Sequence, residues 1–542
     1  MKKIVFIIGL ICMIFIHTGC YEDHSTVATI SMPNITLEGG DTWSTGLQAE
    51  FNAYLNEECN IYCPIDWGDT DSTKFSFSWT LNEKVISTDR ILRYTFNEMG
   101  TNYVLFNVME NETGLSKGMV MKVNVSSKFL LGWLILSEKE NRTSLDFIHI
   151  DTYELYPDIY KDLYPEDNLG SKPYRLEEHF TSAYDQVMVL QRGAPGSLLL
   201  DGRDFKKVML NKDEFIGEKY PYEGFETAQI CYSNGTISGV EILLSAKGEI
   251  YVRMNKSVAS RFQTAMYPPN PVEYTDGRGM RISHFTFPKI TYFQLMFDEL
   301  NNRWLAIFKS STNDKMLPPL EKTYDKGAFP EFFDFCEGMP SNIELVYAQT
   351  CDEWSTSMLV NILKDKNNGK YYFQKSMLRY NSGRSLVEVS EPDQVEFASG
   401  YPINEETVFW MLRGQNTSYQ ASPHVFFNIG SKVYFYRYQT KQVYLFKDCS
   451  LSENPPSGKI VSMHTNPKTN EFGIAFSDGH FYICRSGSQV IEAIVRGDIN
   501  PQDQATNDEI EIAHFTGLGN IVHSIFKYGR FSNYSSAEDR YR

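Results

Sequence analysis

The sequence predicts an all-β protein in which a small N-terminal β-sandwich precedes a large β-propeller of seven or eight blades. Two observations predict this class. Between about residues 29 and 126, short runs of alternating apolar and polar residues are separated by turn residues, as expected for half-buried strands. Beyond residue 128, a strand, a turn and a second aromatic-rich strand recur at intervals of roughly 45 to 70 residues, which is typical of repeating sheets.

The N-terminus predicts an exported chain. Lys2 and Lys3 precede an unbroken apolar run from Ile4 to Ile16. A helix of that run spans about 20 Å, which is too short for a hydrocarbon core of roughly 30 Å. Residues 1–19 are therefore expected to be a cleaved signal peptide.

Residues 17–20 (HTGC) resemble the lipobox of bacterial lipoproteins, although His17 stands where leucine is usual. The resemblance implies that Cys20 is lipidated and begins a tether of residues 20–28. A plain secretory signal with an incidental cysteine is the alternative. Residues 21–23 (YED) resemble the acidic export signal of Bacteroidetes surface lipoproteins. This implies an outer-membrane protein exposed at the cell surface, with a periplasm-facing anchor as the alternative.

Residues 29–126 are expected to form an immunoglobulin-like β-sandwich. The clearest part is a hairpin, in which residues 103–108 and 119–125 alternate between two faces around a turn at residues 111–114.

The order of three motifs in this region, residues 77–79 (FSW), 94–96 (YTF) and 100–104 (GTNYV), follows that of a PKD domain. Residues 27–126 resemble the PKD-like lipoprotein family of Bacteroides, whose larger C-terminal part would cover the rest of the chain. One departure is the turn at residues 80–83, where this sequence lacks the usual Asp-Phe-Gly-Asp-Gly.

Residues 128–530 are expected to form the propeller, followed by a tail of residues 531–542. The repeat is clearest in residues 242–252, 425–435 and 473–483. Looser copies begin at residues 134, 187, 295 and 358. A final apolar run, residues 521–526, is expected to complete the first blade and close the ring. Tandem β-sandwiches are the competing architecture, because no strict signature such as a recurrent Trp-Asp is present.

Charge and cysteine content exclude several classes of protein. The formal net charge is −17, and loss of the two lysines in residues 1–19 brings the mature chain to −19. Without a basic cluster, this charge argues against a nucleic-acid partner, and the lipid anchor is the only membrane contact expected. After removal of Cys12 and lipidation of Cys20, seven cysteines remain, an odd number spread over a long chain, which argues against a disulfide framework, although Cys59 and Cys63 are close enough in sequence to pair.

The sequence contains no short motif for hydrolysis, phosphate binding or zinc binding. Residues 177–179 (EEH) are expected to form a solvated turn, and Asp66, Asp69 and Asp71 a plain β-turn, with a calcium loop as the alternative. Seven histidines are expected to stand singly in loops or in the core: His149, His284, His424, His464, His480, His514 and His523. We therefore predict no catalytic residue, no metal site and no cofactor.

Tyrosines in two long loops are the candidate ligand-binding residues. They are Tyr153, Tyr156, Tyr160 and Tyr164 after the first propeller hairpin, and Tyr267 and Tyr274 around a proline-rich stretch. An exposed tyrosine offers an apolar face and a hydroxyl, which suit a sugar ring or a peptide side chain. The alternative is that these rings pack their own loops against the propeller.

The sequence thus favours a protein that binds and does not catalyse. The family resemblance implies an accessory lipoprotein that captures an oligomeric glycan or peptide beside a TonB-dependent outer-membrane importer and its partner lipoprotein, a SusCD-like uptake system. Two alternatives stay open: a polysaccharide-degrading enzyme with carboxylates in the propeller cleft, and an adhesin or structural surface protein.

Overall fold

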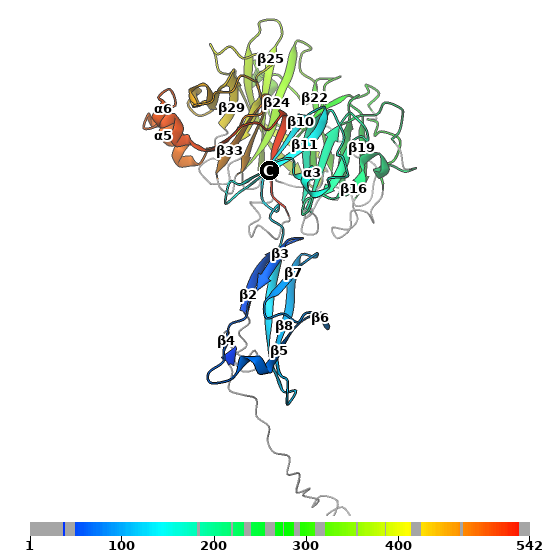
Figure 1. Cartoon of the computed structure of the whole chain (residues 1–542). Coiled ribbons are helices and arrows are strands. Elements are labelled where there is room, and N and C mark those ends of the chain that lie inside the picture. Colours follow the sequence, from blue (N-terminus) through cyan, green and yellow to red (C-terminus); the bar gives the residue numbers. More distant parts are fainter. Residues whose placement is uncertain are drawn as a thin grey trace, which may run out of the picture. The chain divides into compact units, whose positions relative to one another are not determined.

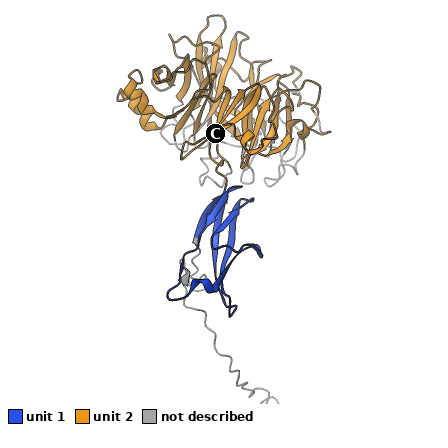
Figure 2. Cartoon of the chain, in the orientation of Figure 1, with its two compact units in different colours: residues 1–126 blue, residues 127–542 orange. Residues whose placement is uncertain are grey.

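A computed structural model of the chain forms two compact units, Met1–Ser126 and Ser127–Arg542 (Figures 1 and 2). It describes residues 36–37, 49–180, 185–217, 220–231, 240–254, 266–274, 276–286, 293–308, 320–353, 356–384, 386–412, 424–466 and 470–529. The predicted signal peptide, Cys20, the tether and the tail of residues 531–542 lie outside the described residues.

Unit 1 is built from short strands. Its main sheet has the order β2 (Ala49–Tyr54), β9 (Ser116–Ser126), β8 (Gly100–Glu110), β5 (Phe75–Leu81) and β6 (Lys84–Ser87). Two further pairs are β3 (Glu58–Ile61) with β7 (Leu92–Thr95), and β1 (Thr36–Leu37) with β4 (Ile65–Asp66), and η1 (Ser72–Lys74) leads into β5. The predicted hairpin is confirmed as β8 and β9, which pair antiparallel.

The core of unit 1 forms around Trp79, whose side chain is fully buried and whose Nε1 donates a 2.8 Å hydrogen bond to the carbonyl oxygen of Asp89. The turn at residues 80–83, which lacks the usual Asp-Phe-Gly-Asp-Gly, connects β5 to β6 as a tight hairpin. Asn82 and Glu83 both have positive φ, as the two central residues of a type I′ hairpin turn require. The thiols of Cys59 and Cys63 are not joined, and each donates a hydrogen bond to a backbone carbonyl oxygen.

The described part of unit 2 contains seven sheets, which are the blades of a propeller. Blade 1 holds β36 (Asn520–Lys527), β10 (Gly132–Lys139), β11 (Arg142–His149) and β12 (Leu155–Tyr156). Blade 2 holds β13 (Pro173–Phe180), β14 (Asp185–Gln191), β15 (Leu198–Asp201) and β16 (Lys207–Leu210). Blade 3 holds β17 (Thr227–Cys231), β18 (Val240–Ser245) and β19 (Ile250–Met254).

Blade 4 holds β20 (Ile282–Thr286), β21 (Phe293–Asp298) and β22 (Arg303–Phe308). Blade 5 holds β24 (Ile343–Glu353), β25 (Thr356–Asp365), β26 (Tyr371–Asn381) and β27 (Leu386–Glu396), with β23 (Leu320–Lys322) added at its edge. Blade 6 holds β28 (Phe409–Leu412), β29 (His424–Ile429), β30 (Lys432–Arg437) and β31 (Gln442–Asp448).

Blade 7 holds β32 (Ile460–Asn466), β33 (Glu471–Phe476), β34 (Phe481–Arg485) and β35 (Glu511–Phe515). Two helices, α5 (Ser488–Arg496) and α6 (Gln504–Ile510), interrupt it between β34 and β35. The remaining helical segments are α3 (Ile159–Leu163), η2 (Asn211–Glu214), η4 (Lys326–Ala328) and η5 (Cys449–Leu451).

The propeller ring is closed by the C-terminal strand. β36 pairs antiparallel with β10, so the first blade combines strands from both ends of unit 2, as predicted. All seven predicted strand–turn–strand repeats are hairpins, one in each described blade. Gly248, Gly430 and Gly479 have positive φ at three of these turns, where a residue with a Cβ atom would be strained.

Each pair of neighbouring blades shares an apolar cluster. Around the ring these are blades 1 and 2 (Phe147, Leu176), 2 and 3 (Met188, Tyr251), 3 and 4 (Ile242, Met296), 4 and 5 (Leu295, Leu359), 5 and 6 (Val360, Phe427), 6 and 7 (Phe426, Phe472), and 7 and 1 (Ala475, Phe526). Consecutive residues of a strand serve opposite neighbours, as Phe426 and Phe427 do, because side chains alternate across a sheet. This explains why the strands are apolar on both faces.

Candidate functional site

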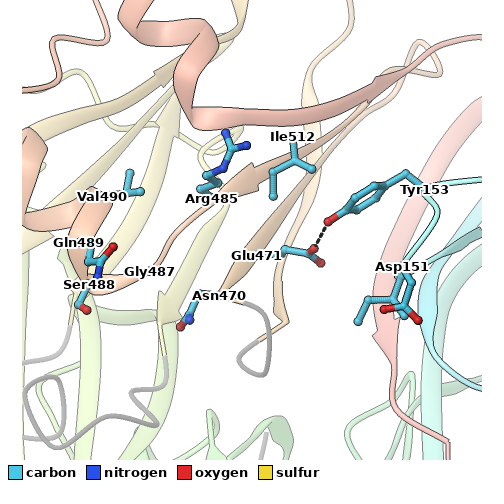
Figure 3. A pocket seen from close by; sticks show the side chains of 11 residues that line it. Asp151, Tyr153, Asn470, Glu471, Arg485, Gly487, Ser488, Gln489, Val490 and Ile512 are labelled. Atoms are coloured by element: carbon cyan, nitrogen blue, oxygen red, sulfur yellow. Dashed lines mark hydrogen bonds between the residues drawn. The ribbon is translucent and has the colours of Figure 1, made fainter.

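A cavity of about 590 Å³ opens between blade 1 and blade 7 (Figure 3). Its lining comes from the β11–β12 loop of blade 1 (Ile150, Asp151, Tyr153), from the facing strands of blade 7 (Asn470, Glu471, Arg485, Ile512) and from the start of α5 (Gly487, Ser488, Gln489, Val490). The lining combines three apolar side chains with charged groups of both signs. Such a mixture suits a polar ligand that also presents an apolar face.

Glu471 lies in the wall of the cavity and is buried, with 1% of its surface exposed. Its Oε1 accepts a 2.6 Å hydrogen bond from the hydroxyl of Tyr153, across the boundary between the two blades. Its Oε2 accepts hydrogen bonds from Trp133 Nε1 at 3.3 Å and from Asn466 Nδ2 at 3.2 Å. Three donors therefore stabilise the Glu471 carboxylate, and the same hydrogen bonds hold the side chains of Tyr153, Trp133 and Asn466 in place.

Tyr153 lies in the left-handed region with φ of 52°. A bulky residue rarely adopts this conformation, and outliers of this kind are concentrated at functional sites. The backbone is held by a 2.9 Å hydrogen bond from its N–H to the carbonyl oxygen of His149, and the ring by its bond to Glu471. Burial, followed by the hydrogen bond to Glu471, raises the pKa of the Tyr153 hydroxyl, so this group stays a donor. The half-buried ring thus lines the cavity in a fixed orientation.

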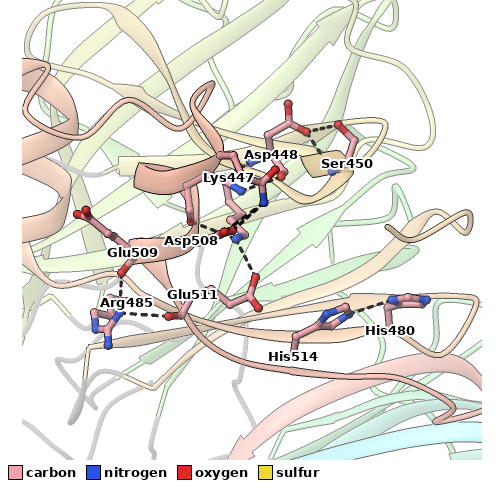
Figure 4. Close-up of polar contacts among 11 residues, drawn as sticks. Lys447, Asp448, Ser450, His480, Arg485, Asp508, Glu509, Glu511 and His514 are labelled. Atoms are coloured by element: carbon pink, nitrogen blue, oxygen red, sulfur yellow. Dashed lines mark hydrogen bonds and ion pairs between the residues drawn. The ribbon is translucent and has the colours of Figure 1, made fainter. Parts of the chain in front are cut away.

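Arg485 ends β34 on the opposite side of the cavity from Asp151 (Figure 3). Its Nη1 donates hydrogen bonds to the carbonyl oxygens of Glu509 at 2.5 Å and of Glu511 at 3.1 Å (Figure 4). Among the described residues, no carboxylate forms an ion pair with Arg485. The guanidinium is therefore held by neutral groups, and its positive charge remains available to the cavity.

Helix α5 begins at the cavity wall. Its N-cap is Gly487, which supplies no side-chain hydrogen bond to the first turn. Ser486 fastens this start to blade 7, because its N–H donates a 2.7 Å hydrogen bond to the carbonyl oxygen of Asn470. The apolar side of the helix, with Ile491 and Ile494 buried, packs against the cluster between blades 6 and 7.

Behind the cavity, a buried polar network joins the helical insertion to blades 6 and 7 (Figure 4). Lys447 is fully buried and its Nζ lies 2.8 Å from Oε2 of Glu511. His480 Nδ1 and His514 Nε2 are 2.9 Å apart, so these two histidines do not stand singly as the sequence predicted. Burial, with a further contribution from His480, lowers the pKa of His514.

Sequence reasoning selected Tyr153 but missed Glu471, Arg485 and the start of α5. The helix had a detectable signal: Ile494 follows Ile491 by three residues and Val490 by four, which is the helical period. Glu471 and Arg485 had none, since they lie at the ends of paired strands and resemble many other charged residues of the chain.

The other tyrosines of the first loop pack within blade 1 and its loops. Tyr160 is 3% exposed and its hydroxyl donates to Asp167, whereas the hydroxyl of Tyr164 donates to the carbonyl oxygen of Asp204. The ring of Tyr156 contacts Phe129 and its hydroxyl donates to Glu154. These three rings fix the loop, as the packing alternative expects.

Tyr267 and Tyr274 cover buried arginines. The Tyr267 ring is fully buried with the guanidinium of Arg253 4.3 Å from its centroid, and the Tyr274 ring has that of Arg303 at 4.8 Å. Each arginine is in turn paired with carboxylates, Arg253 with Glu214 and Glu241, and Arg303 with Asp276 and Asp298. A ring in this position stabilises a buried cation through its face.

The remaining candidates of the sequence have ordinary roles. Asp66 and Asp71 each accept a backbone hydrogen bond from the residue two positions later, which is the geometry of a simple turn. Residues 177–179 do not form the predicted solvated turn but lie within strand β13, where Glu177 pairs with Arg175 and Glu178 accepts the N–H of Tyr528. In the described part of the chain, no group of three or more potential ligands is arranged to hold a metal ion, and no helix is long and apolar enough to cross a membrane.

Comparisons with known proteins agree with the expected N-terminal family. Residues 20–173 match the model of the PKD-like family. This confirms the PKD-like resemblance for that segment, which covers less than half of the chain. No curated protein matches the chain.

Among solved structures, a quinonprotein alcohol dehydrogenase-like protein from Bacteroides thetaiotaomicron is 10% identical with a TM-score of 0.35, covering 91% of this chain and 96% of its own. A putative 6-phosphogluconolactonase from Bacteroides uniformis is 10% identical with a TM-score of 0.40, covering 73% and 99%. The Nup133 β-propeller domain of Vanderwaltozyma polyspora is 8% identical with a TM-score of 0.32, covering 76% and 98%. Likenesses at this level carry no inference about what this chain does.

Proposed function

We propose that the protein is a lipid-anchored, surface-exposed outer-membrane protein that binds an oligomeric nutrient in the cavity between blades 1 and 7. It acts without covalent chemistry, as an accessory to a TonB-dependent SusCD-like importer. The observation that carries the proposal is the Tyr153 ring, which lines the cavity in a left-handed backbone conformation with its hydroxyl bonded to the buried Glu471.

The arrangement of Glu471 favours binding over catalysis. A general acid or nucleophile needs an oxygen that can reach the substrate, whereas both oxygens of Glu471 accept hydrogen bonds from protein groups. Its function is then to position Tyr153. A tyrosine ring held in this way offers an apolar face at little entropic cost, which is what a sugar ring or an amino-acid side chain requires.

The location and the partner rest on the N-terminal signals. Residues 17–20 resemble a lipobox and residues 21–23 resemble an acidic surface-export signal. Residues 20–173 match the PKD-like family, and the resemblance to its Bacteroides lipoproteins implies an importer as the neighbour. In this proposal, unit 1 is a spacer between the lipid and the propeller.

The test is a pull-down of the tagged full-length chain from outer membranes of its native host in mild detergent, followed by mass spectrometry of co-purifying proteins and bound oligomers. We expect a TonB-dependent importer and an oligomeric glycan or peptide. In parallel, the purified chain is incubated with polysaccharides and the products are separated by chromatography. Recovery of the chain alone, together with release of shorter sugars from a polymer, would refute the proposal and favour the enzyme.

A further inference from the structure

We infer that the oligomer bound between blades 1 and 7 is an acidic oligosaccharide, whose carboxylate contacts Arg485 while a sugar ring lies on Tyr153. This inference rests on the proposed function and specifies its ligand. Charged groups of both signs line this cavity.

Arg485 supplies the cationic side of the cavity. Because its Nη1 donates to the carbonyl oxygens of Glu509 and Glu511, the guanidinium plane is fixed before a ligand arrives. Its Nε and Nη2 have no partner among the described residues. A fixed guanidinium edge with two parallel N–H donors matches the two oxygens of a carboxylate, and fixed groups lose little entropy on binding.

The start of α5 adds donors on the same side. Ser488 and Gln489 line the cavity in the first turn of a nine-residue helix whose N-cap lacks a side-chain hydrogen bond. The first backbone N–H groups of a helix have no partner within it and carry partial positive charge. They reinforce the preference for an anion that Arg485 establishes.

Two carboxylates of the lining oppose an anion: Asp151 on blade 1, and Glu471 on blade 7, which pairs in register with Arg485 across β33 and β34. Asp151 is exposed at the rim, and the charge of Glu471 is partly compensated by three hydrogen-bond donors. Figure 3 shows Asp151 beside Tyr153, away from α5, and Glu471 turned toward the Tyr153 hydroxyl. With a net charge of −17, the chain as a whole repels long polyanions, so recognition is expected to need the short-range contact with Arg485.

A sugar accounts for the lining better than a peptide does. The Tyr153 ring and the Asp151 carboxylate lie together, and a sugar presents an apolar ring face beside hydroxyl groups that can donate to a carboxylate. The carboxylate on Arg485 can belong to a uronic acid or to a sialic acid. Both sugars supply the carboxylate that would contact Arg485, and they differ only in the molecule from which it comes.

The test is isothermal titration calorimetry of the purified mature chain with tetragalacturonate, with 3′-sialyllactose, with the carboxyl-reduced form of each, and with tryptic casein peptides. We expect one acidic sugar to bind and its carboxyl-reduced form to bind at least tenfold more weakly. Arg485→Gln is expected to weaken the acidic sugar tenfold or more, and Arg485→Lys less. Arg496→Gln, which removes an exposed arginine from the other end of α5, is the matched control and is expected to leave the affinity within twofold.

Equal affinity for the acidic and reduced sugars, or an affinity that Arg485→Gln leaves unchanged, would overturn the inference but not the proposed function. If only the casein peptides bind, the assignment of a sugar as the ligand is overturned and the ligand is a peptide. If no acidic sugar binds, the inference fails, whereas the proposed function fails separately if the pull-down from native membranes yields no oligomer.

Discussion

Lys527 and Asp185 form a fully buried ion pair that fastens the closing strand of the propeller to the second blade. Lys527 Nζ, at the end of β36, lies 2.7 Å from Oδ1 of Asp185, at the start of β14, and neither side chain is exposed. Lys527 Nζ also donates to the carbonyl oxygen of Leu130 at 3.0 Å. Ring closure therefore combines the β36–β10 ladder with a charged contact to the neighbouring blade.

Removing one partner of this pair is expected to destabilise the propeller strongly. Lys527→Met leaves the Asp185 carboxylate buried without its cation, at a cost of about 3 to 5 kcal/mol. The double variant Lys527→Met/Asp185→Asn is expected to recover part of this loss because no charge remains buried. Urea unfolding followed by far-UV circular dichroism measures both. A single variant as stable as the wild type would show that the pair does not contribute to closure.

Gly473→Ala is expected to disturb the contact between blades 7 and 1. A Cβ atom at Gly473 would lie 2.6 Å from a ring carbon of the fully buried Trp133, which also donates to Glu471. Overpacking of this kind costs about 1 to 3 kcal/mol. Gly383→Ala is the control, since its added methyl meets only Asn381 at 3.5 Å. Thermal unfolding of the two variants should differ by several degrees, and equal melting temperatures would contradict this account of the interface.

Acid is expected to destabilise the propeller through His284 on β20 and His523 on β36. Burial, then the charge of Arg175, lowers the pKa of His284 to about 4. A histidine whose pKa is depressed in the folded state contributes stability that is complete above its unfolded value of about 6.5 and is lost as pH falls toward 4. Burial also lowers the pKa of His523, whose Nδ1 accepts the N–H of Leu176.

The free energy of unfolding, measured by urea titration at pH 7 and pH 4.5, should fall more in the wild type than in His284→Gln. The expected difference is on the order of 2 kcal/mol. Parallel pH dependence in the two proteins would show that His284 does not titrate as its burial indicates.

Lipidation is expected to depend on Cys20 alone. Cys20→Ser should abolish incorporation of labelled palmitate and release the chain from the membrane fraction, whereas Cys12→Ser should leave both unchanged because Cys12 belongs to the predicted signal peptide. Labelling that survives Cys20→Ser would place the anchor elsewhere, and an unlabelled wild type would favour a plain secretory signal.

Much of the fold could be predicted because its strands are local. Each hairpin is a continuous segment, such as residues 425–435, whose turn glycine and apolar flanks are visible in the sequence. The apolar run at residues 521–526 could be assigned to the first blade because the other apolar runs already had a partner strand next to them in the sequence. The helices of blade 7 were missed because their short apolar period is embedded among strands.

The cavity could be predicted only in part, because its walls come from segments more than 300 residues apart, as the Tyr153–Glu471 hydrogen bond shows. Tyr153 was selected for its residue type, and so were Tyr160 and Tyr267, which are buried. Sequence alone does not separate a tyrosine that lines a cavity from one that covers a buried arginine, since both stand in polar loops beside strands. The difference depends on long-range packing.

The central claim is that ligand binds at Tyr153. The most direct test is calorimetric titration of the wild type, Tyr153→Ala and Tyr103→Ala with maltotetraose, cellotetraose, tetragalacturonate, 3′-sialyllactose and tryptic casein peptides. Tyr103, 54% exposed on unit 1, controls for the loss of a surface tyrosine. We predict that any compound bound by the wild type binds Tyr153→Ala at least tenfold more weakly and Tyr103→Ala equally well. A compound that binds the wild type and Tyr153→Ala with the same affinity would contradict the account.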